Sequence, residues 1–278
     1  MKVAYLGPPG THSEEALRAS APEAVEEIPH PTIYDAVMAV QEGAVDRAVV
    51  PMENALEGAV AVTLDTLALE AVDVRIAAEI VYPIHHCLVA ARPLELAGVT
   101  RVVSHPQAIA QCAHFLREQL PGAEHVSAPS TADAVASLGD AGPETAALGS
   151  RLSAELYGCE VIAPDVEDRP DNVTRFVWLA PAGQTPEPDG DAKTTIVFWG
   201  GGDESPGWLV DVLGELSSRA VNLTRIESRP RRIRLGHYMF FADLEGAATQ
   251  APVDEALDAL RGHVQEVRVL GSYPAFPG

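Results

Sequence analysis

The chain of 278 residues carries 40 acidic and 19 basic side chains, so its formal net charge is −21. A protein this negative repels polyphosphate, which excludes general binding to nucleic acid or to an anionic membrane surface. Hydrophobic residues make up 47% and charged residues 21%. This composition excludes overall disorder and, at this length, predicts one large domain or two to three smaller ones with buried cores.

Short apolar runs alternate with helical patterns over residues 1–180. We expect strands at 3–6, 48–51, 75–81, 87–90, 101–103 and 146–148. We expect helices at about 33–40, 59–70, 106–120, 131–138 and 151–157, the first capped by Thr32 with Asp35 at the N3 position. This alternation predicts an α/β domain with a largely parallel sheet. Because such sheets bind ligands at the carboxyl ends of their strands, functional residues are expected in the turns that follow the strands.

Several features indicate a cytoplasmic location without a metal. No run of about 18 apolar residues, the length of a membrane span, occurs, and the N-terminal strand is broken at Gly7, too early for a signal peptide. Three cysteines cannot all pair, so reduced thiols are expected: Cys87, Cys112 and Cys159. The spacing of neighbouring His and Cys residues matches no common zinc motif, and helical spacing with Ile109 and Leu116 predicts that Cys112 is a core residue.

The pattern changes after residues 181–192, which are rich in Pro, Gly and acidic residues and predict a linker. Residues 193–278 then show strands near 194–199, 222–228, 237–243 and 264–270, and helical faces near 209–216 and 253–260. The order βαββαβ is that of ferredoxin-like α+β domains. One face of such a sheet holds both helices, and the other often pairs with a second copy.

The first motif, GPPGTHS, joins a predicted strand to a helix. It lacks the Lys of a P-loop, which excludes an NTPase. Its backbone N–H groups and the hydroxyls of Thr11 and Ser13 suit an anion, and a capped tight turn is the equal alternative. The next two motifs also follow strands: VPMENALEG presents Glu53 and Asn54, and SHPQAIAQC presents a helix cap and two amides on one helix face, namely Ser104, Gln107 and Gln111.

These motifs, followed by ALGS, LYG and NVTRF, resemble prephenate dehydratase over nearly all of residues 1–180. The family often has Ser where Ala55 stands. The segment after the linker resembles the ACT regulatory domain that is usually fused to this enzyme. The resemblance implies two lobes like those of periplasmic binding proteins, with the active site in the cleft, and a C-terminal α+β ferredoxin-like ACT domain. Its boundaries would be about 1–78 and 163–180 for lobe 1, 79–162 for lobe 2, 181–192 for the linker and 193–278 for the ACT domain.

The implied reaction converts prephenate to phenylpyruvate, CO2 and water. Aromatisation drives it, so no cofactor or metal is expected. The departing hydroxide must be protonated or strongly hydrogen-bonded, and the resemblance assigns this role to Thr174. Arg175 would supply the local field or anchor the loop, and Glu53 is the alternative acid if burial keeps it protonated. The remaining candidates would bind the substrate or, for Phe176, fix the Thr174 rotamer: Thr11, Ser13, Asn54, Ser104, Gln107, Gln111 and Phe176.

The motif ESRP resembles the phenylalanine-binding motif of ACT domains, although an ordinary strand end with Pro230 is the simpler interpretation. With the resemblance, an allosteric phenylalanine site is favoured, completed across a homodimer or within a homotetramer. Its residues would be Gly207, Leu209, Asn222, Leu223, Glu227, Ser228, Arg229 and Pro230. Trp208 stands where the family has Ala, which alters the expected shape of this pocket.

Two other functions remain open: an arogenate dehydratase, and a non-catalytic sensor of amino acids or aromatic acids. We expect a monofunctional enzyme, since no chorismate mutase segment is present. Residues 1–180 carry 26 acidic and 10 basic side chains, yet the substrate is a dianion. The cleft should therefore be locally positive or rich in neutral donors, with the acidic residues on the outer surface. High acidity with two lysines also suits a high-salt cytoplasm.

Overall fold

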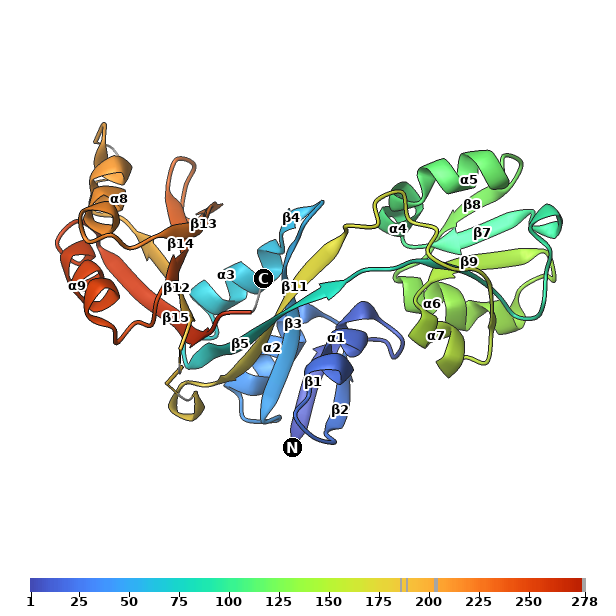
Figure 1. The fold of residues 1–278 in the computed structure, drawn as a ribbon, viewed down its shortest axis with the longest axis horizontal. Coiled ribbons are helices and arrows are strands. Elements are labelled where there is room, and N and C mark those ends of the chain that lie inside the picture. Colours follow the sequence, from blue (N-terminus) through green and yellow to red (C-terminus); the bar gives the residue numbers. More distant parts are fainter. Residues whose placement is uncertain (186, 189, 203–204, 277–278) are drawn as a thin grey trace.

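The structure, a computed structural model, describes residues 1–185, 187–188, 190–202 and 205–276. Its three sheets lie in a row, with the N-terminal strands in the middle (Figure 1). We call the bodies built on these sheets lobe 1 (the middle one), lobe 2 and the C-terminal domain. Among the described residues, no helix has the length and apolar content that crossing a membrane requires.

Lobe 1 is a mixed sheet with three helices. Its elements are β1 (Lys2–Leu6), α1 (His12–Ser20), β2 (Glu26–His30), α2 (Ile33–Gln41), β3 (Arg47–Asn54), β4 (Gly58–Ala59), α3 (Ala61–Leu69), β5 (Val74–Pro83) and β11 (Val173–Pro181). The strand order is β2–β1–β3–β11–β5, with β4 beside β3. β1 runs parallel to β2 and β3, whereas β11 is antiparallel to β3 and β5. The prediction of a largely parallel sheet holds for β2, β1, β3 and β5, which run in one direction, whereas β11 returns from lobe 2 and runs against them.

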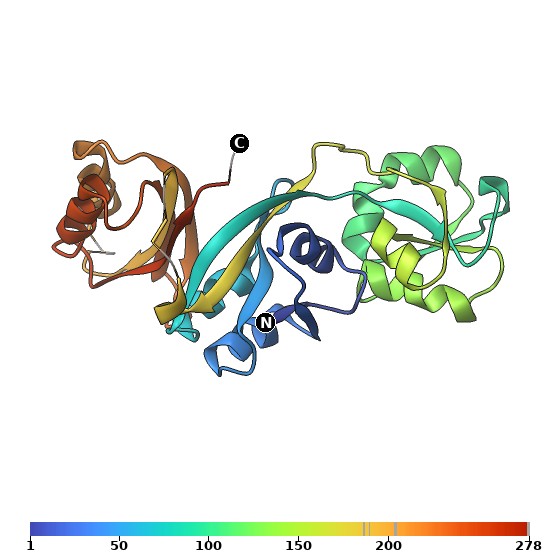
Figure 2. The same ribbon diagram turned by 60° about the horizontal axis from the view of Figure 1, so that its bottom comes forward.

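Lobe 2 has a second mixed sheet, in the order β10–β6–β9–β7–β8. Its elements are β6 (Cys87–Ala90), β7 (Arg101–Ser104), α4 (Pro106–Gln111), α5 (Ala113–Gln119), β8 (Glu124–Ser127), α6 (Thr131–Ala136), β9 (Thr145–Gly149), α7 (Arg151–Leu156) and β10 (Glu160–Ala163), with 3-10 turns at Leu96–Gly98 and Ser137–Asp140. Two connecting segments, residues 84–86 and 164–172, join the lobes side by side (Figure 2). We call them the crossover segments.

The single helix predicted over residues 106–120 is divided at Cys112. The Gln111 carbonyl accepts the Asp168 N–H at 2.7 Å, and the Asp168 carboxylate accepts the His114 N–H at 3.0 Å. The second crossover segment thus takes over backbone groups that would otherwise continue the helix. Cys112 itself is fully buried, as its spacing predicts, and Thr32 caps α2 as predicted by accepting the Asp35 N–H at 3.1 Å.

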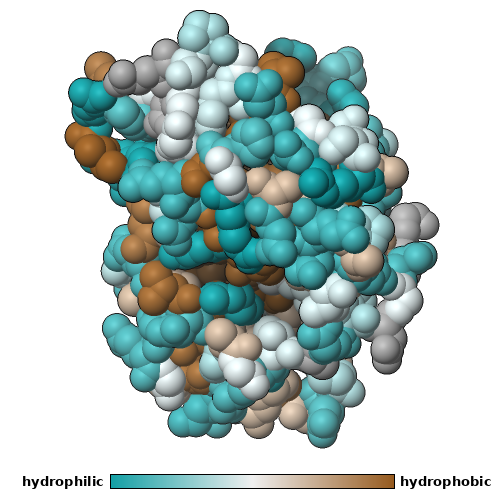
Figure 3. Space-filling view, turned by 90° about the vertical axis from the view of Figure 1, so that its left-hand side faces the viewer, coloured by the Kyte–Doolittle hydropathy of each residue, from teal (hydrophilic) through white to brown (hydrophobic). Residues whose placement is uncertain are grey.

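The C-terminal domain has the predicted βαββαβ order. After a 3-10 turn at Ala182–Gln184, its elements are β12 (Ala192–Trp199), α8 (Trp208–Ser218), β13 (Leu223–Pro230), β14 (Tyr238–Glu245), α9 (Ala251–Leu260) and β15 (Glu266–Pro274). The antiparallel sheet runs β13–β14–β12–β15, and both helices cover one face of it. Figure 3 views the molecule from this end, where apolar side chains stand among hydrophilic ones.

The second face of this sheet packs on lobe 1 of the same chain. Val197, Phe241 and Tyr273 belong to one buried cluster with residues of β3, α3 and β5. The approach is close: a Cβ at Gly271 would lie 2.3 Å from the Ile76 carbonyl oxygen, so only Gly is accommodated there. In this chain lobe 1 occupies the face that often pairs with a second copy in such domains.

Candidate active site

A cavity of about 300 Å³ lies between the two lobes. Lobe 1 contributes the start of α1 and residues of β3 and β11, and lobe 2 contributes the first turns of α4 and α6. Seven of the predicted catalytic and substrate-binding residues line it: Thr11, Ser13, Asn54, Gln107, Gln111, Thr174 and Phe176. Motifs that lie far apart in the sequence thus meet at one site between the lobes.

A hydrogen bond from Asn54 orients the Thr174 hydroxyl. Its Nδ2 donates to Thr174 Oγ1 at 2.8 Å, while its Oδ1 accepts the N–H groups of Leu56 and Glu57 at 3.0 Å each. The two backbone donors determine which end of the amide faces Thr174. Since Oγ1 accepts the bond from Asn54, the hydroxyl proton of Thr174 is available for a ligand in the cavity.

A chain of hydrogen bonds continues from Asn54 across the cavity to lobe 2. Asn54 Nδ2 also lies 2.9 Å from Asn172 Oδ1, and Asn172 Nδ2 donates to Gln111 Oε1 at 3.3 Å. His86 Nε2 lies 2.9 Å from the same Gln111 oxygen and must donate to it. Burial, and next the nearby His12, lower the pKa of His86 to about 4, so its ring is neutral at pH 7.

The histidines His12 and His86 line this cavity and are absent from the sequence-based candidates. His12 Nδ1 lies 2.7 Å from Glu15 Oε2, and its Nε2 is buried without a hydrogen-bond partner among the described residues. The two rings stand edge to face with centroids 5.5 Å apart. A signal was present in GPPGTHS, where His12 lies between the two hydroxyl residues and three positions before a carboxylate, the spacing of neighbours on a helix.

Three of the predicted site residues lie outside this cavity. Arg175 projects from the other face of β11, because side chains alternate along a strand, and contacts the C-terminal domain. Glu53 lies 3.2 Å from Arg225 Nε of β13. Ser104 donates to the Leu148 carbonyl at 2.8 Å within lobe 2. The predicted capping by Ser104 is corrected, because His105 occupies the N-cap of α4.

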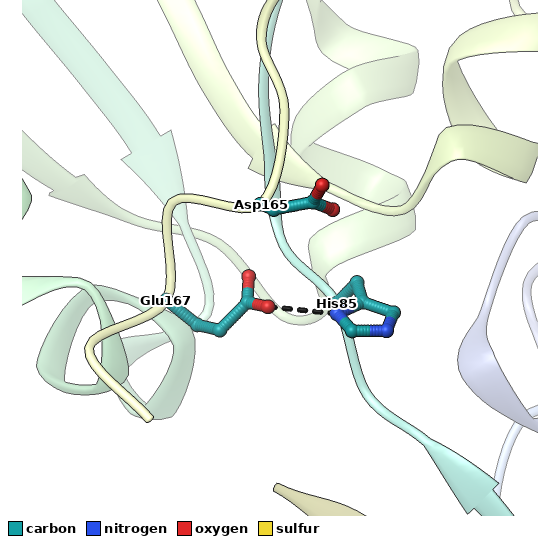
Figure 4. Close-up of side chains that lie close together, drawn as sticks. All are labelled: His85, Asp165 and Glu167. Carbon is teal, nitrogen blue, oxygen red and sulfur yellow. Dashed lines mark hydrogen bonds and ion pairs between the residues drawn. The ribbon is translucent and has the colours of Figure 1, made fainter. Parts of the chain in front are cut away.

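His85, Asp165 and Glu167 gather where the crossover segments meet (Figure 4). The side-chain atoms of these residues that could bind a metal ion lie within 4.8 Å of one another. His85 Nδ1 lies 2.7 Å from Glu167 Oε1, and the His86 N–H donates to Glu167 Oε2 at 2.9 Å. Burial alone would raise the pKa of Glu167, but these two hydrogen bonds hold it below its usual value. Glu167 therefore ties one crossover segment to the other.

The predicted effector residues do not converge within one chain. Gly207 and Leu209 line a cavity of about 230 Å³ with Trp208, whose Nε1 donates to the His263 carbonyl at 2.7 Å. A separate cavity at the end of α8 includes Asn222 and Leu223. The four ESRP residues, Glu227, Ser228, Arg229 and Pro230, lie on β13 at the sheet edge, with Arg229 paired to Asp65 of lobe 1.

Comparisons with known proteins agree with this architecture. The family model for prephenate dehydratase matches residues 3–184, and the ACT domain model matches residues 194–262. A protein named prephenate dehydratase from Amycolatopsis methanolica is 38% identical over 278 residues, covering 100% of this chain and 90% of its own.

Two solved structures are also similar over nearly the whole chain. One is a prephenate dehydratase from Arthrobacter aurescens in complex with L-Phe, with 40% identity, a TM-score of 0.91, and coverage of 99% of this chain and 90% of the other. The second, described as GqqA, a novel type of quorum quenching acylase, has 32% identity, a TM-score of 0.88, and coverage of 100% and 99%. With the family model and these relatives, the chain belongs to the prephenate dehydratase family, in the form that carries a C-terminal ACT domain.

Proposed function

We propose that the cavity between the lobes converts prephenate to phenylpyruvate, with Thr174 as the donor to the departing hydroxyl group. The observation that carries this proposal is the bond from Asn54 Nδ2 to Thr174 Oγ1, which leaves the hydroxyl proton directed to another acceptor. A threonine hydroxyl is a very weak acid, so its value lies in being held in place before the reaction begins.

The reaction needs a donor but no redox partner. The bond between the ring and its carboxylate breaks, its electron pair enters the ring, and the bond to the hydroxyl oxygen opposite breaks as the ring becomes aromatic. The leaving oxygen takes up one proton and departs as water, and the carboxylate departs as CO2. A hydrogen bond from Thr174 to that oxygen stabilises the charge that develops on it.

The cavity lining suits a dianion without adding many formal charges. His12 Nε2 is buried and unpartnered among the described residues. Because Nδ1 donates to the Glu15 carboxylate, Nε2 can donate to a substrate carboxylate when the ring is in its imidazolium form. The amide of Gln107 and the hydroxyl of Ser13 add neutral donors, and the start of α1 favours negative charge through the helix dipole. The lining thereby offsets the acidity of the surrounding domain.

The test is turnover of prephenate by the purified chain, followed as phenylpyruvate formation. Thr174→Val keeps the shape of the side chain and should lower kcat by at least ~10²-fold, the scale of a positioned proton donor. Thr174→Ser, which retains the hydroxyl, is the matched control and should keep more activity than Thr174→Val. Near-normal turnover by Thr174→Val would refute this role.

The fold alone does not decide the activity, since a structure described as an acylase shares it. An arogenate dehydratase would use the same cavity on the amino analogue of the substrate. Competition between prephenate and arogenate in one assay separates these two dehydratases, and absence of turnover with both would favour the acylase or a sensor.

We further propose that phenylalanine regulates the enzyme through the C-terminal domain and that two copies complete the effector site. The proposal is supported by the L-Phe complex of the Arthrobacter aurescens relative and by the separation of the predicted effector residues within one chain. Exposed apolar residues are available for pairing: Val210, Ile226, Ile233 and Leu235. Calorimetry with phenylalanine, together with the molecular mass in solution, tests this proposal, and no heat with unchanged activity would refute it.

A cytoplasmic location is part of the same proposal. The three cysteines are all free in the structure, as expected in a reducing compartment.

A further inference from the structure

A buried cluster of charged side chains joins the back of β11 to the C-terminal domain. Arg175 Nη1 donates to Asp243 Oδ2 of β14 at 2.5 Å, and Arg175 Nη2 donates to the Tyr273 hydroxyl of β15 at 2.7 Å. Arg175 Nε lies 2.6 Å from Glu79 Oε2 of β5. These four residues are buried, so the guanidinium has exchanged water for fixed partners on two domains.

The hydrogen bonds around Arg175 form a closed ring in which every proton is assigned. Thr195 Oγ1 donates to Asp243 Oδ1 at 2.7 Å, since a carboxylate accepts. Tyr273 therefore donates to Thr195 Oγ1 at 2.6 Å while accepting from Arg175. Each bond of this ring joins buried groups, so removal of one member leaves a buried partner unsatisfied.

This cluster lies directly behind the proposed active-site hydroxyl. Thr174 and Phe176 line the cavity on one face of β11, and Arg175 between them faces the C-terminal domain. The pairing of β11 with β3 shifts register at this point, because Arg175 is opposite Glu53 and Phe176 is opposite Pro51. The extra residue of this bulge is Met52 of β3, while β11 stays in regular register with β5 over Val173–Trp178. On the β3 side of β11, the contact of Arg175 with the C-terminal domain adds a further constraint.

We propose that Asp243 and Tyr273 are positioning residues for the dehydration: by holding Arg175, they fix β11 so that the Thr174 hydroxyl faces the cavity. This inference rests on the function proposed above. It makes the C-terminal domain part of the active-site support, in addition to any role as an effector domain. Loss of the support from Asp243 or Tyr273 should lower kcat more than it weakens substrate binding, because neither residue lines the cavity.

A second ion cluster between the same domains provides a matched control. Asp65 of α3 is buried and pairs with Arg229 at 3.0 Å and with Arg232 at 2.6 Å. It therefore joins lobe 1 to the C-terminal domain as Asp243 does, but through a helix instead of β11. Asp65→Asn should weaken domain docking without moving Thr174.

The experiment compares the full-length chain with Asp243→Asn, Tyr273→Phe and Asp65→Asn, after thermal unfolding has shown which variants are folded at the assay temperature. Asp243→Asn should lower kcat about 10- to 100-fold, the effect of a small misplacement of a reacting group, with KM changed by no more than about twofold. Tyr273→Phe removes one hydroxyl and should lower kcat less. Asp65→Asn should keep the wild-type kcat.

Hydrogen exchange of the β11 amides gives a second readout that does not depend on turnover. Exchange should accelerate in Asp243→Asn and stay at the wild-type rate in Asp65→Asn. An inactive wild-type chain would refute the proposed function, and hydrogen exchange would still decide whether Asp243 fixes β11. Wild-type kcat in folded Tyr273→Phe and Asp243→Asn, or equal loss in Asp65→Asn, would overturn the inference. If Asp243→Asn does not fold, Tyr273→Phe decides the result.

Discussion

Acidification should destabilise the protein through His86, whose ring is neutral at pH 7 and buried beside His12. Burial is the main reason that its pKa falls to about 4, and the electrostatic interaction with His12 is the second. The Gln111 hydrogen bond and the carboxylates of Glu167 and Glu15 oppose the shift only in part. In the unfolded chain the pKa of His86 returns to about 6.5. Between these two values the unfolded chain carries a proton on His86 that the folded chain does not.

The sign and size of the effect follow from this difference. Because the unfolded state binds more protons between pH 6.5 and 4, the free energy of unfolding decreases as the pH falls through this window. A difference of about 2.5 pKa units at 1.36 kcal/mol each gives a loss of about 3 kcal/mol. Below pH 4 both states bind the proton and His86 contributes no further loss.

Urea unfolding of the wild type and of His86→Gln between pH 7.5 and 4 tests this prediction. Gln keeps a donor for Gln111 but does not titrate, so the wild type should lose about 3 kcal/mol more than the variant over the window. Carboxylates such as Glu167 titrate in both proteins, and their contribution cancels in the comparison. Parallel pH profiles for the two proteins would refute the assignment of a neutral, buried His86.

Three further predictions concern the cavity and the surface charge. His12→Phe removes the buried Nε2 and should raise KM for prephenate about tenfold, as expected for one hydrogen bond to a charged group; steady-state kinetics measures this, and an unchanged KM would contradict it. Asn54→Ala releases the Thr174 hydroxyl and should lower kcat at least ~10-fold with a smaller change in KM; equal kcat in the same assay would show that Thr174 holds its position without Asn54. Activity and melting temperature should both rise in molar KCl, because salt screens repulsion between exposed acidic residues; full activity and an unchanged melting temperature at low salt would contradict this expectation.

The sequence was sufficient to bring the cavity residues together. Thr11 and Asn54 each lie in a motif that follows a predicted strand, and strand ends in an α/β sheet meet at one edge. The family resemblance, through the motif NVTRF, added Thr174. Periodicity also predicted the βαββαβ order of the C-terminal domain, since its helical faces are regular and apolar. These patterns predict local features: the period of an element, its ends, and the chemistry of the turn that follows.

The sequence pattern did not predict which face of β11 the Arg175 side chain occupies, although Arg175 follows Thr174 directly. β11 is buried on both faces from Thr174 to Ala180, so no alternation of apolar and polar residues distinguishes the cavity side from the domain side. The partners of Arg175 in β14 and β15 are also distant in the sequence. The same limit explains the second face of the C-terminal sheet, because an apolar face indicates that something covers it but not what does.

Some acidic residues have a role besides solvation, because they are buried and paired. Among the described acidic residues, the buried ones are few, and each pairs with an Arg: Glu14, Asp65, Glu79 and Asp243. All except Glu14 lie where lobe 1 meets the C-terminal domain. Arg229, predicted to serve the effector, pairs with Asp65 of lobe 1, and so does Arg232.

Charge pairing therefore contributes to holding the two domains of one chain together. Salt should act differently on the two groups of acidic residues, because buried pairs are screened much less than exposed charges. High salt can then relieve the repulsion on the outer surface while the contacts behind β11 persist. An acidic catalytic domain joined to a nearly neutral C-terminal domain thus remains docked under the same conditions that we expect to stabilise it.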